Sequence, residues 1–136
     1  PEVGGDIRVA AYNVLNYFTT LTTQNSQARG ARTAEQLAIQ ESKIVAAING
    51  LDADVVALQE IENSVKLGEP TDEALQALVA ALNAQAGAGT WDYVRTPAAL
   101  TDAAIVDFIS NAIIFKPAAV TPVGDSFTQL DETVWD

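Results

Sequence analysis

The sequence of 136 residues contains no cysteine, no histidine and no methionine. Without cysteine, disulfide bonds and cysteine-ligated zinc are excluded, and thiols say nothing about the compartment. Without histidine, the usual general base and the commonest metal ligand are missing. Any chemistry in this chain therefore depends on carboxylates, amides, hydroxyls, lysine or arginine. The missing initiator methionine favours a processed chain or an internal piece of a longer one.

Basic residues are also scarce, with seven Lys and Arg against eighteen Asp and Glu and a net charge of −11. This balance argues against nucleic-acid binding through a broad basic surface. It does not exclude a nucleic-acid enzyme, because a divalent cation held by carboxylates can reverse the local field. Most of the acidic residues are expected to form a solvated surface. No signal peptide and no apolar run of membrane length is present, so no membrane partner is expected.

What the sequence does contain is a regular alternation of short apolar runs and amphipathic stretches, with 49% hydrophobic residues. Strands are predicted at residues 7–13, 55–59, 91–95 and 111–117, with a further edge segment at 119–124. Thr33 and Gln36 form a capping-box pattern that predicts a helix to about residue 49, ended by Gly50. A second helix is predicted at residues 72–86. This order predicts one domain of the α/β class, a sheet covered by helices. Trp135, near the end of a tail without a clear pattern, favours a fold that continues past Asp136.

Polar side chains follow two of the predicted strands, at Asn13 and Glu60. In open α/β sheets, functional groups gather where strands end. Carboxylate and amide oxygens suit Mg²⁺ or Ca²⁺, and Mg²⁺ often takes only one or two protein carboxylates. Glu60 as ligand with Asn13 beside it is thus chemically sufficient for one Mg²⁺. The structural alternative is ordinary, since a Glu after a strand is usually solvated and an Asn usually forms a turn.

Three stretches together carry a resemblance to a known family: "IRVAAYNVLNYFTT", "RGARTAEQLAIQESKIVAAINGLDADVVALQEIEN" and "DFISNAIIFKPAAVTPVG". They resemble the endonuclease/exonuclease/phosphatase superfamily, and within it the branch of secreted bacterial endonucleases, over about residues 6–124. The resemblance implies a four-layered α/β/β/α sandwich of the deoxyribonuclease-like type, in which two sheets pack face to face with helices outside. Residues 1–136 would be an incomplete, N-terminal portion of one such catalytic domain.

The resemblance also implies an activity, metal-dependent phosphodiester hydrolysis by an extracellular endonuclease, with DNA favoured over RNA as the substrate. Glu60 matches the family's metal-binding Glu, and Asn13 the Asn beside the metal and the scissile phosphate. Asp107 matches an acidic position that orients the catalytic centre, and Lys116 a basic position near the substrate backbone. The implied metal is Mg²⁺, with Ca²⁺ or Mn²⁺ as alternatives. Gln59, Glu62 and Asn63 are expected to support the loop.

The chain departs from the family pattern because the family's catalytic histidine, its Asp-Phe-Asn segment and its final Asp-His pair are missing. It therefore holds only the first half of the implied active site, and by itself it is expected to be inactive. A half-sandwich would expose one sheet face, which predicts a homo-oligomer through that face. Two alternatives stay open. One is a phosphatase or phospholipid phosphodiesterase of the same superfamily, and the other is a non-catalytic binding or structural module.

Overall fold

The computed structural model describes residues 4–124 of the chain. Six main elements follow one another in the order β1 (Val9–Tyr17), α1 (Ala34–Gly50), β2 (Val55–Glu62), α2 (Glu73–Ala86), β3 (Asp92–Tyr93) and β4 (Ile109–Phe115). Two short 3-10 turns, η1 (Ser64–Leu67) and η2 (Ala98–Leu100), lie before α2 and before β4. The predicted order of strands and helices is confirmed for these six elements. The tail, including Trp135, lies outside the described residues.

The predicted edge segment at residues 119–124 is wrong, because these residues form no strand. After β4 the chain turns at once, and the N–H groups of Ala119 and Val120 both donate to the carbonyl of Lys116. Pro122 has no N–H with which to extend a ladder. The turn and the proline together keep this segment out of the sheet.

The four strands form one mixed sheet in the order β1-β2-β4-β3. The pair β1 and β2 is parallel and is joined through α1, whereas β4 runs antiparallel to both β2 and β3. The carboxyl ends of β1 and β2 and the start of β4 therefore lie at the same edge of the sheet. The fold is a mixed α/β fold, as the sequence predicts.

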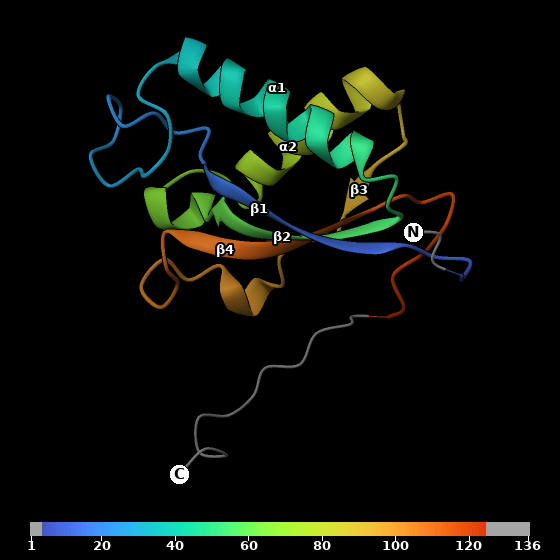
Figure 1. Cartoon of the computed structure of the whole chain (residues 1–136). Coiled ribbons are helices and arrows are strands. Elements are labelled where there is room, and N and C mark those ends of the chain that lie inside the picture. Colours follow the sequence, from blue (N-terminus) through green and yellow to red (C-terminus); the bar gives the residue numbers. More distant parts are fainter. Residues whose placement is uncertain (1–3, 125–136) are drawn as a thin grey trace.

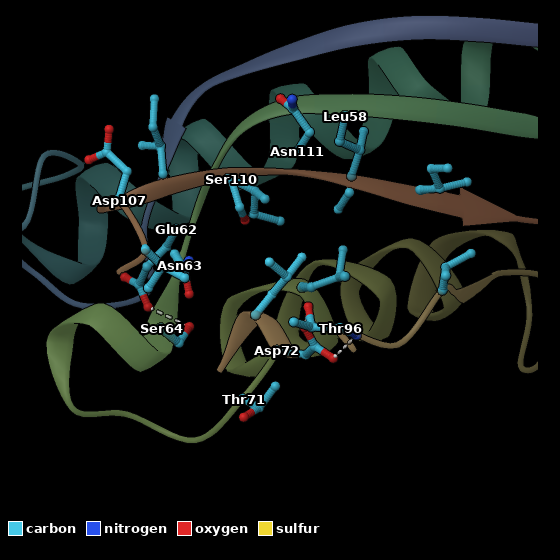
Figure 2. A pocket seen from close by; sticks show the side chains of 18 of the residues that line it. Leu58, Glu62, Asn63, Ser64, Thr71, Asp72, Thr96, Asp107, Ser110 and Asn111 are labelled. Carbon is cyan, nitrogen blue, oxygen red and sulfur yellow. Dashed lines mark hydrogen bonds between the residues drawn. The ribbon is translucent and has the colours of Figure 1, made fainter. Parts of the chain in front are cut away.

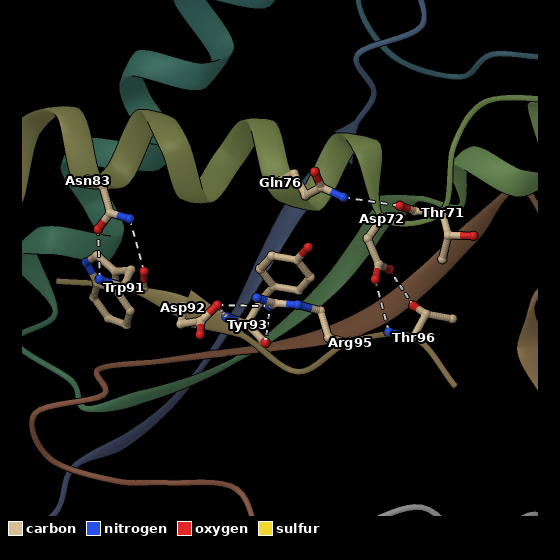
Figure 3. A network of polar contacts seen from close by, with 9 residues as sticks. All are labelled: Thr71, Asp72, Gln76, Asn83, Trp91, Asp92, Tyr93, Arg95 and Thr96. Carbon is tan, nitrogen blue, oxygen red and sulfur yellow. Dashed lines mark hydrogen bonds and ion pairs between the residues drawn. The ribbon is translucent and has the colours of Figure 1, made fainter. Parts of the chain in front are cut away.

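Both helices begin at residues that the sequence indicates, but they begin differently. Thr33 caps α1, and its Oγ1 accepts a hydrogen bond from the Gln36 N–H at 3.3 Å. Asp72 caps α2 with a φ of 64° and makes no side-chain bond to its own helix. Instead its carboxylate accepts from the N–H and the hydroxyl of Thr96, which ties the chain after β3 to the start of α2 (Figure 3).

The main core lies between the helices and one face of the sheet (Figure 1). The inward side of the two helices is apolar at the predicted positions, which are buried or half-buried. These helix positions are Leu37, Ile44, Val45, Ile48, Leu75, Leu78, Val79 and Leu82. From the sheet, Val14, Val56, Leu58 and Ile114 are at most 1% exposed.

The opposite face of the sheet is covered less completely. The register places Ala11, Ala57 and Ile113 in one row on this face. Val9 and Leu15 of β1 are 73% and 72% exposed. The segment that contains η2 lies on this side, below β4 in Figure 1. Within residues 4–124, none of the helices has the length and apolar character that a membrane crossing requires.

Candidate functional site

Strands β1 and β2 are both irregular at the edge where the sequence places Asn13 and Glu60. Their pairing shifts register between Asn13 and Tyr17 on β1, and β2 shifts against β4 between Leu58 and Ile61. The shifts coincide with left-handed backbone at Leu15 (φ 55°), Asn16 (φ 53°) and Glu60 (φ 62°). For residues other than glycine, this conformation costs about 1–2 kcal/mol. Such bulges re-aim side chains and are frequent next to active sites.

The bulges bring Asn13 and Glu60 into direct contact. Asn13 Nδ2 donates to Glu60 Oε1 at 2.8 Å, across 47 positions of sequence. Asn13 Oδ1 accepts from the Leu15 N–H at 2.7 Å, which fixes the orientation of the amide. The amide therefore turns its NH₂ group toward the carboxylate. It keeps one further N–H for a ligand or a water molecule.

The donor set at this contact fits a hard divalent cation. Within the described residues, Glu60 Oε2 accepts no hydrogen bond, and the side chain is only half-buried. The same residues contain no group of three or more His, Cys, Asp or Glu side chains that could hold a metal. A single carboxylate with water ligands matches Mg²⁺, which keeps several waters and binds few protein groups. Ligation of such an ion by Glu60, and by Asn13 beside it, stays a prediction.

Glu62, two residues further along β2, is a second carboxylate with the opposite environment. It is 4% exposed and accepts hydrogen bonds from the Thr20 N–H at 3.0 Å and the Ser64 hydroxyl at 2.8 Å. Ser64 Oγ in turn accepts from the Ala74 N–H at the start of α2. Glu62 thus joins the loop after β1, the end of β2 and α2, as Figure 2 shows for its bond to Ser64. This is the supporting role that the sequence predicts.

Tyr17 closes the same edge from the helix side. Its side chain is fully buried, and its hydroxyl donates to Glu41 Oε2. Burial raises the pKa of Tyr17 well above its usual value of 10.0, and the hydrogen bond and charge of Glu41 raise it further. The phenol is therefore neutral across the physiological range and acts as a fixed donor. It anchors the end of β1 to α1 next to the irregular segment.

Asp107 lies at this edge of the sheet but has different partners. It stands two residues before β4, and Oδ1 accepts from the Phe108 N–H at 2.6 Å. The same oxygen is 3.5 Å from Nη2 of Arg29, in the loop after β1. The structure therefore places Asp107 at the same edge of the sheet as Glu60, next to the guanidinium of Arg29. Its role in orienting a catalytic centre stays a prediction.

The structure does not bring Lys116 to this edge. Because β4 is antiparallel to β2, Lys116 follows the pair Phe115 and Val55 at the opposite end of the sheet. Its N–H donates to the Asp54 carbonyl, and its Nζ lies 5.3 Å from the centre of the Trp91 ring. Five positions of β2 separate Val55 from Glu60, which is roughly 17 Å of strand. A substrate contact by Lys116 stays a prediction, and it has no support from the position of Asn13 and Glu60.

A cavity of about 660 Å³ lies between the sheet and the segment that leads from β3 to β4 (Figure 2). Its wall is mixed, with apolar Leu100 and Ile105 opposite polar Gln59 and Asn111. Asp107 lines it, whereas Asn13, Glu60 and Lys116 do not. The bond between Asp72 and Thr96 holds one side of this cavity in place. The cavity therefore adjoins the Asn13–Glu60 contact without containing it.

Sequence reasoning missed the residues that gather around Phe108. Arg29 and Lys66 both lie over its ring, and they come from connections 37 positions apart in sequence. No short motif marks such a cluster, because its members meet only through the pairing of β1, β2 and β4. The one usable signal in the sequence is the small number of basic residues, which makes the position of each of them in the fold informative.

Comparison of the chain with protein-family models, with curated proteins and with solved structures finds no match. Function is therefore argued from the geometry of the Asn13–Glu60 contact and its surroundings.

Proposed function

We propose that this chain supplies the metal-holding part of a phosphodiesterase that hydrolyses the backbone of DNA. The observation that carries the proposal is the 2.8 Å hydrogen bond between Asn13 and Glu60 at the carboxyl ends of two parallel strands. Glu60 itself, and Leu15 and Asn16 shortly after Asn13, have left-handed backbone that is unfavourable for a non-glycine residue. An ordinary solvated Glu needs neither a bulge nor a fixed amide partner.

Glu60 and Asn13 would have different roles in this reaction. Glu60 would hold the cation, because one of its carboxylate oxygens is not used by Asn13. When bound, Mg²⁺ would supply Lewis-acid polarisation of a phosphate oxygen and charge stabilisation for the leaving oxygen. Asn13 keeps the carboxylate in position and offers its remaining N–H to a phosphate oxygen, where negative charge develops during the reaction. The 136 residues contain no histidine, so the proposal assigns the general base to another part of the protein.

The proposal includes the sandwich architecture. The open face of the sheet, with Val9 at 73% and Ile113 at 45% exposure, is suited to packing against a second sheet. In that arrangement residues 1–136 form the N-terminal portion of one catalytic domain. The incompletely covered face also supports association of two copies when the chain is prepared alone.

A magnesium titration followed by backbone amide NMR tests the metal site. We expect the amide signals of Asn13 and Glu60 to shift and saturate at millimolar Mg²⁺, with Ca²⁺ and Mn²⁺ as parallel samples. The variant Glu60→Gln should remove the response, because it keeps the shape and loses the charge. The matched control, Glu69→Gln, alters an exposed carboxylate in the loop before α2 and should leave the response intact.

Two results would oppose the proposal. The first is an unchanged spectrum at millimolar metal, or an equal response in Glu60→Gln. The second concerns activity, since the chain by itself is expected to leave plasmid DNA intact in the presence of Mg²⁺. Robust cleavage by these 136 residues would show that the assignment of the general base is wrong.

A further inference from the structure

Only seven residues of the chain are basic, and two of them converge on a single aromatic ring. We propose that Arg29 and Lys66, together with the Phe108 ring that holds them, form a site for the phosphate backbone of a nucleic-acid strand. These three residues are called the Phe108 cluster. The inference rests on the proposed function, because it names where the substrate of the Asn13–Glu60 site is held.

The geometry of the Phe108 cluster places two like charges within 5.5 Å of the centre of one ring. The guanidinium carbon of Arg29 is 5.0 Å from the ring centre, and Lys66 Nζ is 5.5 Å from it. Each distance is within the range of a cation–π interaction, which offsets the repulsion between the two cations. The backbone of Phe108 is fixed, because its carbonyl accepts from the Asn63 N–H at 2.9 Å. A preorganised pair of cations binds an anion at a lower entropy cost than two free side chains.

Arg29 is presented by a loop that is tied down on both sides. Gly30 packs so closely on β1 that an added Cβ would lie 2.5 Å from the Cβ of Phe18. The Thr22 N–H donates to the Ala31 carbonyl, and the Thr23 hydroxyl donates to the Arg32 carbonyl. The backbone that carries Arg29 is therefore fixed next to the end of β1, independently of any ligand.

Both cations keep donors for a ligand. Within residues 4–124, the Arg29 guanidinium makes one ion pair, at 3.5 Å to Asp107, and both partners are largely exposed. Exposed pairs of this kind contribute little, so a phosphate can replace the carboxylate. Lys66 uses one of its three N–H groups on the Ala103 carbonyl at 2.8 Å. With Asp107 counted, the Phe108 cluster still carries one net positive charge in a chain of −11.

The place of the Phe108 cluster in the fold suits a strand that passes over the Asn13–Glu60 contact. Arg29 follows β1, Lys66 follows β2 and Phe108 precedes β4, so all three lie at the sheet edge where Glu60 lies. Because the ring is occupied by two cations, the cluster offers charge rather than a free stacking surface. It should therefore bind backbone phosphate without regard to base sequence.

Binding of a short fluorescent single-stranded DNA to the full chain, measured by anisotropy in EDTA, tests the site without metal. We expect Arg29→Gln and Lys66→Gln each to weaken binding by roughly three- to tenfold at low salt. Each should also reduce the slope of log affinity against log salt by about 0.7, the value for one lost phosphate contact on a single strand. The charge-preserving variants Arg29→Lys and Lys66→Arg should retain most of the affinity. Lys43→Gln, an exposed change on α1, is the matched control and should have little effect.

The inference is overturned if the oligonucleotide does not bind, or if Lys43→Gln weakens binding as much as the two variants of the cluster. It is also overturned if neither Arg29→Gln nor Lys66→Gln changes the affinity. The Mg²⁺ titration separates this outcome from a failure of the metal site. Arg29→Gln and Lys66→Gln should keep the response of Glu60 to Mg²⁺. A chain that binds DNA through the cluster but shows no Mg²⁺ response would instead refute the proposed function.

Discussion

The two halves of strand β2 show two different uses of the same backbone. From Val55 to Leu58 the strand keeps a continuous register with β1 on one side and β4 on the other, and Val56 and Leu58 are fully buried. From Gln59 to Glu62 the register with β4 shifts, one residue is left-handed and three of four side chains are polar. The first half stabilises the fold by burying apolar surface. The second half gives up regular pairing and thereby places two carboxylates in unlike surroundings.

The contrast continues in the neighbouring strand. In β1, the residues that pair with the regular half alternate between the core and the open face, whereas Leu15 and Asn16 beside the irregular half have positive φ. The side chain of Gln40 stabilises this left-handed backbone, because its Nε2 donates to the carbonyl of Leu15 at 2.9 Å. The register shifts occur in both β1 and β2, and α1 supports them through Gln40. They are therefore a built feature of the fold, because a chance distortion of one strand would have no such supporting contacts.

The largest effect is expected in the regular half. Leu58→Ala removes a fully buried side chain from the core between the sheet and the helices. We expect the free energy of unfolding to fall by about 2–5 kcal/mol, from lost burial and the cavity left behind. Urea denaturation measures it, with Leu15→Ala, at a leucine that is 72% exposed, as the control. Equal losses in the two variants would mean that the regular half of β2 is packed no better than the exposed, irregular end of β1.

The next effect is expected at the buried carboxylate of the irregular half. Glu62→Ala would leave the Thr20 N–H and the Ser64 hydroxyl without their acceptor in a buried place. We expect a loss of about 1–3 kcal/mol, the usual cost of such unsatisfied groups. Glu69→Ala, on an exposed loop residue, should be nearly neutral. A loss below that of Glu69→Ala would show that Glu62 does not hold the loop.

The regular features of this fold could be predicted from the sequence, and the irregular ones could not. The cap at Thr33 and the apolar spacing in α2 are local signals, and both appear in the structure. The sequence predicts that β1 ends at Asn13 and β2 at Gln59, where polar residues begin. Both strands in fact continue, to Tyr17 and Glu62, through bulges. No glycine marks the positive φ of Glu60, so the sequence carries no sign of the bulge.

The candidate site was predictable only in part, for a similar reason. The approach of Asn13 to Glu60 agrees with two strand ends that meet at one edge. The Phe108 cluster depends on the antiparallel placement of β4, and the sequence alone did not specify that direction. Lys116 lies at the far end of the sheet because of the same reversal. Direction of strand pairing is set by long-range packing, which a pattern within one strand does not encode.

A pH dependence is expected next in size, and it also belongs to the irregular half, where Tyr17 pairs with Ile61. Because the pKa of Tyr17 is raised, the folded chain keeps a phenol proton that the unfolded chain releases near pH 10. The stabilisation is therefore complete below pH 10 and is lost as pH rises above it, by at most about 1.4 kcal/mol per pH unit. Tyr17→Phe should remove this contribution, so that its stability falls less steeply than that of the wild type. If the free energy of unfolding falls equally steeply above pH 10 in the wild type and in Tyr17→Phe, the assigned role of Tyr17 is wrong.

The smallest expected effect compares two adjacent residues of β2, Gln59 and Glu60, each replaced by Ala and by Gly. Both Glu60 variants lose the bond to Asn13, so their difference reports only the backbone. At φ 62° the alanine is strained, and we expect Glu60→Gly to be more stable than Glu60→Ala by about 1 kcal/mol. Gln59 is not among the described residues with positive φ, and there glycine should be less stable than alanine by about 0.5–1 kcal/mol.

The opposite signs are the result that matters, because they would place the strained backbone of the irregular half at Glu60 and not at its neighbour Gln59. Thermal and urea denaturation of the four variants at one pH would measure both differences. If the glycine variant is less stable than the alanine variant at both positions, the backbone at Glu60 is not strained. The orientation of the Glu60 carboxylate then does not depend on strained backbone. If glycine is favoured at position 60 alone, the fold gives up stability to orient Glu60. Glu60→Gly should then remove the strain and the carboxylate together and leave the fold intact.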